Sequence, residues 1–218
     1  AAVVVVVVLV VMKKKADVVI VGTGVAGLFS ALNLPDDKEI IMITKSDAES
    51  SDSFLAQGGI CVLRDEQDYD SYFEDTMRAG HYENRKESVD IMIRNSGKII
   101  EDLVGYGVEF EKDGEALAYT REGAHSRPRI LFHADVTGKE ITSKLLARVR
   151  EKNNVTIYEY TTMTDILEEN GKCAGITVKT QSGEESSIYA DYTILASGGI
   201  GGLYQHSTNF PHLTGDAL

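Results

Sequence analysis

Apolar residues occur in short runs near the start of the chain, and glycines separate them. Residues 18–21 form one such run, a GxGxxG glycine motif follows at residues 22–27, and a helix-compatible stretch continues until Pro35. A second apolar run covers residues 39–44. A strand, a glycine turn, a helix and a second strand in this order predict a βαβ unit of the Rossmann type.

Three later segments show the apolar spacing of amphipathic helices. They are residues 69–78, 87–106 and 138–152. Two segments between them lack such a period. Residues 54–60 are too glycine-rich for a regular element, and residues 111–135 are rich in glycine, histidine and arginine. We therefore expect both of the irregular segments to be functional loops.

The last third of the chain alternates short apolar runs with turns. Four strand-like runs are residues 155–160, 164–169, 174–180 and 186–188. Turn pairs at Asn170-Gly171 and Ser182-Gly183 predict a small antiparallel meander built from these runs. A further run at residues 192–196 predicts a short buried strand that leads into a second glycine turn.

Composition narrows the class of protein and its partners. The chain has 218 residues, 43% of them apolar, and a formal net charge of −12. That negative charge disfavours nucleic acid and anionic membrane surfaces as partners. Cys61 and Cys173 lie far apart without metal-ligand spacing, so we expect free thiols, no metal site and a reducing cytoplasm.

The two ends of the chain are unusual. Residues 1–11 are almost all valine, a run too short to span a bilayer and unlike a signal peptide. We expect this segment to be a separate strand of unassigned sequence, with Met12 as the natural start. The chain stops inside what resembles the start of another element, so we expect residues 12–218 to be one domain, truncated at its carboxyl end.

The glycine motif has a specific physical role in binding nucleotides. Gly22 permits a tight turn, Gly24 lets a pyrophosphate approach the backbone, and Gly27 permits close helix–strand packing. An NAD site of this type has an acidic residue at the end of the second strand, where this chain has Lys45. Lys45 is either a lysine that reaches the cofactor or a solvated surface residue.

Several blocks of sequence together resemble the succinate dehydrogenase, fumarate reductase and L-aspartate oxidase flavoprotein family. The blocks are VVIVGTGVAGL, TK, SFLAQGGI, TREGAHS, HADVTG, ASGGIGGLYQHSTN and GDA. They occur in the order of the family, from Asp17 to Leu218, and the AQGGI element at residues 56–60 is highly specific. The resemblance implies a glutathione-reductase-like Rossmann FAD-binding α/β domain, with a central parallel sheet, helices on one face, the small meander on the other, and the capping domain absent.

By this resemblance, the FAD contacts come from six parts of the chain. The glycine turn contacts the pyrophosphate, Lys45 lies near the ribose, and residues 53–59 run beneath the flavin. The residues assigned to FAD are Gly22, Thr23, Gly24, Val25, Ala26, Gly27, Lys45, Asp52, Ser53, Phe54, Leu55, Ala56, Gln57, Gly58, Gly59, Met163, Thr164, Ala196, Ser197, Gly198 and Asp216. The alternative for residues 196–199 is a simple turn at the end of a strand.

Asp52 decides how the flavin is held. Respiratory members of the family attach FAD to a histidine just before the AQGG element, and Asp52 stands at that position here. A carboxylate cannot form the histidyl-flavin bond, so the resemblance implies non-covalent FAD, as in L-aspartate oxidases and soluble fumarate reductases.

The block at residues 119–138 resembles the L-aspartate oxidase branch most closely. There a glutamate at the position of Glu122 lies near the substrate, so we predict Glu122 as a catalytic-site residue buried near a ligand; the alternative is a surface glutamate. A dicarboxylate also needs a local positive site. Four residues are candidates that the sequence does not rank: His125, Arg127, Arg129 and His133.

The activity implied by the resemblance is oxidation of L-aspartate to iminoaspartate by hydride transfer to flavin N5. Oxygen or fumarate then reoxidises the flavin, and the product enters NAD biosynthesis through quinolinate, with quinolinate synthase as a possible partner. The fragment alone is expected to be inactive. Two alternatives stay open: a soluble fumarate reductase and a non-catalytic NAD-binding module.

Overall fold

The computed structural model describes residues 13–218, and the valine-rich segment at residues 1–11 lies outside the described residues. The chain divides into two compact units, residues 1–51 with 149–218 and residues 52–148. The elements in chain order are β1 (Lys13–Val21), α1 (Val25–Asn33), β2 (Ile40–Ile43), α2 (Asp52–Leu55), β3 (Ile60–Cys61), η1 (Glu66–Asp68), α3 (Tyr69–Ala79), α4 (Lys86–Gly105), β4 (Lys112–Asp113), β5 (Ala116–Leu117), β6 (Ile130–Leu131), α5 (Thr137–Glu151), β7 (Val155–Tyr158), β8 (Thr161–Glu169), β9 (Lys172–Thr180), β10 (Glu185–Leu195) and η2 (Gly201–Leu203).

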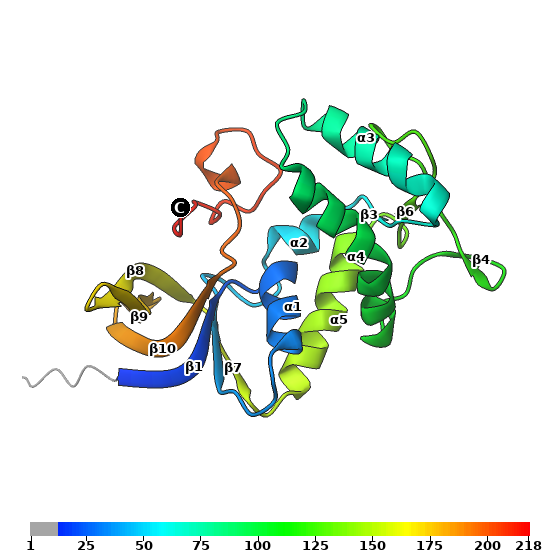
Figure 1. The fold of residues 1–218 in the computed structure, drawn as a ribbon. Coiled ribbons are helices and arrows are strands. Elements are labelled where there is room, and N and C mark those ends of the chain that lie inside the picture. Colours follow the sequence, from blue (N-terminus) through cyan, green and yellow to red (C-terminus); the bar gives the residue numbers. More distant parts are fainter. Residues whose placement is uncertain (1–12) are drawn as a thin grey trace, which may run out of the picture. The chain divides into compact units, whose positions relative to one another are not determined.

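A six-stranded mixed sheet organises the first unit (Figure 1). Its order is β7-β2-β1-β10-β9-β8. The strands β7, β2, β1 and β10 run parallel, whereas β10, β9 and β8 are joined by antiparallel pairing. The predicted βαβ unit is confirmed, since β1 and β2 pair in parallel and α1 connects them.

Alternating side chains of β1 face two different layers. Gly27 of α1 packs against the Ile20 side of the strand, where a Cβ on the glycine would lie 3.4 Å from the Ile20 side chain. Val19 and Val21 point the other way and share a core cluster with Ile176 and Val178 of β9. Residues of β9 therefore pack on the face of β1 that α1 does not cover, and the meander is a continuation of the same sheet through β10.

Two predictions about the strands are wrong. The run at residues 155–160 does not belong to the meander, because β7 pairs in parallel with β2 at the edge of the sheet. The runs at 186–188 and 192–196 are parts of one strand, β10, and its second part is not buried, since Tyr192 is 70% exposed. Each run satisfied a local strand pattern, but only long-range pairing decides which strand is the neighbour.

The Asn170-Gly171 turn is confirmed as the hairpin between β8 and β9. Glu169 pairs with Lys172, which leaves these two residues as the loop. Their φ angles are +54° and +75°, the left-handed values that a type I′ turn requires at both positions.

Helices dominate the second unit, and the three predicted helices are confirmed as α3, α4 and α5. Tyr72 and Met77 of α3 pack with Val89 and Ile93 of α4 in one core cluster. The segment at residues 111–135 has only the short strands β4, β5 and β6. One turn of helix, α2, begins the glycine-rich segment for which no regular element was predicted. Among residues 13–218, no helix is long and apolar enough to span a membrane.

Candidate functional site

The glycine turn after β1 brings two backbone segments of the first unit very close together. Gly22 has a φ of +113°, and a Cβ there would lie 2.2 Å from the Ala196 carbonyl oxygen. A Cβ on Gly27 would lie 2.1 Å from the Gly22 carbonyl oxygen. Both distances are far below van der Waals contact, so only glycine fits at either position. The geometry agrees with the turn and packing roles predicted for Gly22 and Gly27.

The amino terminus of α1 has the features of an anion site. Gly24 is the N-cap residue, it supplies no side-chain hydrogen bond, and the first turn contains no acidic residue. Val25 and Ala26 follow in that turn, and the Thr23 side chain is buried. A helix amino terminus without a competing carboxylate favours a phosphate through its N–H groups and its dipole. The residues present therefore fit the pyrophosphate of a dinucleotide.

Lys45 follows β2 and is not a solvated surface lysine. Its ammonium donates to the His212 carbonyl oxygen at 2.9 Å and to Thr214 Oγ1 at 2.6 Å, and it forms an ion pair with Asp216. Burial alone would raise the pKa of Asp216, but the hydrogen bonds from Lys45 and Thr214 hold that pKa below its ordinary value. The structure thus brings together Lys45 and Asp216, two residues predicted to contact the cofactor.

The second glycine turn lies beside the first. The Ala196 N–H donates to the Val21 carbonyl oxygen at 2.8 Å, and Ser197 continues the turn. Gly198 has a φ of +78°, and a Cβ there would lie 3.3 Å from the Leu213 side chain. Because β1, β2 and β10 are parallel, their carboxyl ends lie at one edge of the sheet, where α/β folds bind ligands.

Met163 and Thr164 lie near the start of β8, at a register shift between β8 and β9. The Met163 side chain belongs to the core of the first unit, and Thr164 Oγ1 is 2.8 Å from Thr177 Oγ1. Met163 is buried, so a cofactor contact there would use its backbone, whereas the exposed Thr164 hydroxyl keeps further hydrogen-bonding capacity.

The remaining predicted FAD contacts belong to the second unit. Asp52, Ser53, Phe54 and Leu55 form α2, whereas Ala56, Gln57, Gly58 and Gly59 form an exposed segment after it. Gly138, in the first turn of α5, holds this segment. Its N–H donates to the Ala56 carbonyl oxygen at 2.8 Å, and a Cβ on it would lie 2.2 Å from the Ser53 carbonyl oxygen.

Gly138 is a residue that the sequence reasoning did not assign to the site. A glycine in the first turn of a helix is a poor helix former, and that local conflict was the available signal. The contact with residues 53–56 itself comes only from the tertiary structure.

Glu122 is exposed in the described structure, so the predicted burial near a ligand is not seen. Its carboxylate lies beside the glycine-rich segment, because a Cβ on Gly58 would be 3.4 Å from Glu122 Oε2. Of the candidate positive residues, His133 Nδ1 is 2.7 Å from the Glu109 carbonyl oxygen, and Arg127 is half exposed and 4.0 Å from Asp68.

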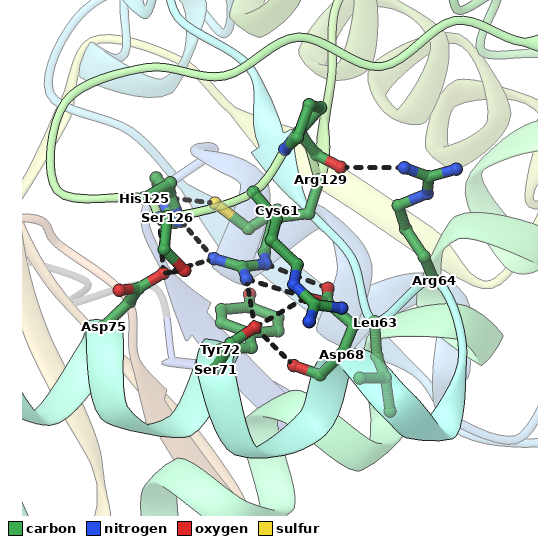
Figure 2. Close-up of polar contacts among 12 residues, drawn as sticks. Cys61, Leu63, Arg64, Asp68, Ser71, Tyr72, Asp75, His125, Ser126 and Arg129 are labelled. Atoms are coloured by element: carbon green, nitrogen blue, oxygen red, sulfur yellow. Dashed lines mark hydrogen bonds and ion pairs between the residues drawn. The ribbon is translucent and has the colours of Figure 1, made fainter.

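Arg129 cannot serve as a positive site for a dicarboxylate, contrary to its candidacy. Its side chain is fully buried and forms ion pairs with Asp68 and Asp75 at 2.8 and 2.7 Å (Figure 2). The guanidinium also lies over the Tyr72 ring, 4.9 Å from its centroid. No signal within the local sequence distinguishes this buried arginine from Arg127, because its two carboxylate partners are more than fifty residues away.

The cluster shifts the pKa values of its own members. Burial would raise the pKa of Asp75, but hydrogen bonds from Ser126 and Arg129 outweigh it and bring that pKa to about 2. The pKa of Asp68 is lowered in the same way, because Arg129 and Ser71 outweigh burial. Asp68 in turn raises the pKa of Arg129. The cluster is therefore fully ionised at neutral pH.

A loss of stability in acid follows from the depressed pKa of Asp75. The unfolded state binds the proton first, so the stabilisation is fully present above pH 3.8 and is lost as the pH falls toward about 2. We expect the free energy of unfolding to fall by roughly 2 kcal/mol across this window through Asp75. Urea unfolding at several pH values measures it. The fall should shrink in Asp75→Asn and persist in a control at the exposed Asp113, Asp113→Asn; an equal fall in both variants would contradict the assignment.

Comparisons with known proteins also indicate an FAD-binding domain. Residues 17–218 match the sequence profile of a family described as FAD binding domain. An L-aspartate oxidase of Clostridium perfringens is 45% identical over 203 residues, which cover 93% of this chain and 46% of that protein. An L-aspartate oxidase of Clostridium acetobutylicum is 42% identical over the same shares. The chain thus spans about half the length of these relatives.

Solved structures with the same fold include a quinol fumarate reductase and an Sdh1 protein. E. coli quinol fumarate reductase superposes with a TM-score of 0.89 at 25% identity, over 94% of this chain and 36% of that chain. Mycobacterium smegmatis Sdh1 superposes with a TM-score of 0.85 at 26% identity, over 94% and 37% of the two chains.

Proposed function

The chain belongs to the FAD binding domain family, and from this premise we propose that it is the FAD-binding part of an L-aspartate oxidase. In the proposed reaction, L-aspartate is oxidised to iminoaspartate, and oxygen or fumarate is the final acceptor. The observation that carries the proposal is the 45% identity to an L-aspartate oxidase over 93% of the chain. The glycine turn and the uncapped amino terminus of α1 support the cofactor assignment independently.

FAD, when bound, supplies the two-electron acceptor that the oxidation requires. The task of the chain is to bind and orient it. In the first unit, we propose that Gly22 to Gly27 hold the pyrophosphate, while Lys45 and Asp216 contact the adenosine side. Met163, Thr164 and residues 196–198 are further proposed contacts. In the second unit, residues 52–59 are the proposed flavin contacts, and Asp52 makes them non-covalent because it stands where the covalent link requires histidine.

Glu122 is the proposed substrate-facing residue of the second unit. Its carboxylate is exposed beside Gly58, so a substrate that approaches the glycine-rich segment meets a fixed negative charge. That charge attracts the ammonium group of L-aspartate, and it repels a plain dicarboxylate such as succinate. The proposed product, iminoaspartate, would supply quinolinate and hence NAD biosynthesis in the cytoplasm, with quinolinate synthase as the proposed partner.

The full-length gene product tests this proposal. We expect a yellow protein whose flavin is released by acid precipitation, and hydrogen peroxide production that depends on L-aspartate. In Glu122→Gln, we expect kcat/KM for L-aspartate to fall by roughly tenfold or more while flavin content is unchanged, because one charge contact is worth about 1–3 kcal/mol. Flavin that stays with the precipitated protein would contradict non-covalent binding, and flavin without aspartate turnover would contradict the activity.

The second candidate is a soluble fumarate reductase. The similarity of fold to quinol fumarate reductase favours it, since both chemistries use the same cofactor domain. The assay separates the two functions: reduction of fumarate by a dye donor, without oxidation of L-aspartate, would replace the first proposal by this one.

A further inference from the structure

The Arg129 guanidinium uses every hydrogen-bond donor that it has. Its Nε donates to Asp68 Oδ2 at 3.0 Å, and its Nη2 donates to Asp68 Oδ1 and Ser71 Oγ, both at 2.8 Å. Its Nη1 donates to Asp75 Oδ2 at 2.7 Å and meets His125 Nδ1 at 3.1 Å. Arginine has five N–H groups, so all five are occupied by these acceptors (Figure 2).

The contact with Arg129 determines the tautomer of His125. Arginine stays protonated and only donates, so His125 Nδ1 must accept and cannot carry a proton. A neutral ring then has its proton on Nε2, which is 3.3 Å from Cys61 Sγ and donates to it. The imidazole is thus held between a cationic donor on one nitrogen and a sulfur acceptor on the other.

Asp75 attaches the segment that contains His125 to α3. Its Oδ2 accepts from the Ser126 N–H at 2.6 Å and from Ser126 Oγ at 2.7 Å, in addition to Arg129. The His125 N–H donates to the Glu122 carbonyl oxygen at 3.3 Å. The segment at residues 122–126, which we call the Glu122 loop, is therefore tied to the buried cluster at its carboxyl end.

The loop is mostly exposed, although the His125 ring packs edge-on against Tyr72 with 6.2 Å between the ring centroids. A cavity of about 480 Å³ lies beneath it, lined among others by Ala124 and His125 of the loop, Cys61 of β3 and Tyr72 of α3. Ala124 also has a φ of +70°, a backbone conformation that non-glycine residues adopt only when their surroundings impose it. The two residues that follow Ala124 are the ones bonded to the cluster, His125 to Arg129 and Ser126 to Asp75.

Stability alone does not account for such a cluster. A buried ion pair generally stabilises a fold no better than apolar side chains of the same volume, because its charges lose their hydration. Two carboxylates and one guanidinium with directed hydrogen bonds fix the direction in which each bonded group lies.

We propose that Arg129 is a positioning residue, which locks His125 as the Nε2–H tautomer and, through Asp75, holds the Glu122 loop in the geometry that presents Glu122. This inference rests on the proposed function for the role of Glu122, whereas the tautomer and the loop anchoring stand on the contacts alone. Arg129 acts through its neighbours and does not touch the substrate.

The test uses the full-length flavoprotein with four variants. Ser126→Ala removes one hydroxyl bond to Asp75 and keeps every charge, so it should fold. Ser126→Thr keeps a hydroxyl and is the rescue variant. Arg129→Lys keeps the charge but supplies three donors from one nitrogen instead of five in a fork. Arg94→Met is the matched control, because Arg94 also pairs with an aspartate and lies over a tyrosine ring, but on the exposed surface of α4.

Ser126→Ala should keep its flavin content and lose roughly tenfold in kcat/KM for L-aspartate, as expected for a misplaced site residue. Ser126→Thr should recover most of that loss, and Arg94→Met should behave like the wild type. A melting temperature that falls in Ser126→Ala while kcat and KM stay unchanged would overturn the proposal, because that is the result of a merely structural role.

A second measurement does not depend on the reaction. Side-chain ¹⁵N spectra of histidine-labelled protein, with His125 assigned by its loss in His125→Gln, should show Nδ1 without a proton and Nε2 with one. In Arg129→Lys, the Nδ1–H tautomer should become populated. A wild-type Nδ1–H tautomer would overturn the proposal even in an active enzyme. If L-aspartate is not a substrate but the tautomer is as stated, the proposed function fails and the role of Arg129 in the loop stands, with kinetics then measured on fumarate.

Discussion

Gly22→Ala is expected to abolish FAD binding by the full-length protein. The new methyl group would lie 2.2 Å from the Ala196 carbonyl oxygen, and the backbone would have to keep a φ of +113°. The atoms nearest to this methyl group are backbone atoms of Ala196 and Ser197, which cannot rotate away as a side chain could. The two glycine turns must therefore separate. We expect a destabilisation of roughly 3 kcal/mol or more, since strain and a backbone clash act together.

Flavin fluorescence during titration measures the binding, and urea unfolding measures the stability. Gly114→Ala is the matched control, because Gly114 has a φ of +65° and open space around its Cβ position. That variant carries the strain without the clash and should lose only about 1–2 kcal/mol while FAD binding is normal. FAD binding by Gly22→Ala with wild-type affinity would show that the close approach to Ala196 is not needed.

Gly138→Ala is expected to weaken FAD binding by at least roughly tenfold, a loss of about 1.4 kcal/mol, because the new Cβ displaces backbone of the second unit. Alanine is the better helix former by about 1 kcal/mol, so helix propensity alone predicts a more stable protein. The structure predicts the opposite, since the Cβ would lie 2.2 Å from the Ser53 carbonyl oxygen and 2.6 Å from that of Ala56. Displacing these carbonyls moves the segment that we propose to contact the flavin.

The control for Gly138 is Gly97 in α4, where a Cβ meets nothing within 4 Å. Gly97→Ala should raise the free energy of unfolding by up to about 1 kcal/mol and leave FAD affinity unchanged. If Gly138→Ala is also stabilised and binds FAD normally, the contact between α5 and residues 53–56 has no role in the cofactor site.

Local pattern was sufficient for the βαβ unit, for the helices α3, α4 and α5, and for the glycine turns of the first unit. The predicted helix at residues 69–78 is α3, Tyr69–Ala79, and the Asn170-Gly171 hairpin has the two positive φ angles that its sequence requires. These features depend on residues within a few positions of one another, because helix periodicity and turn conformation are local properties. Sequence alone likewise supplied the resemblance to the flavoprotein family.

The sequence did not show which distant strands and side chains become neighbours in the folded chain. The sequence placed β7 in the meander, and it gave Arg129 the same candidacy as Arg127, although one is buried and the other is half exposed. Both arginines stand in the same irregular segment with the same chemistry. The difference is that Asp68 of η1 and Asp75 of α3 pair with Arg129 in the folded chain. No local sequence rule describes that pairing.

By itself, the sequence therefore determined the βαβ unit, the predicted FAD-binding glycines and the positions of α1, α3, α4 and α5. Only the tertiary structure showed that Lys45 contacts His212 and Asp216 and that Gly138 lies close to Ser53. It also showed that all hydrogen-bond donors of Arg129 are used within a buried cluster. The physical reason is separation along the chain. Lys45 and His212 are 167 residues apart, and Arg129 and Asp68 are 61 apart, so these contacts form only when burial and charge pairing assemble distant segments.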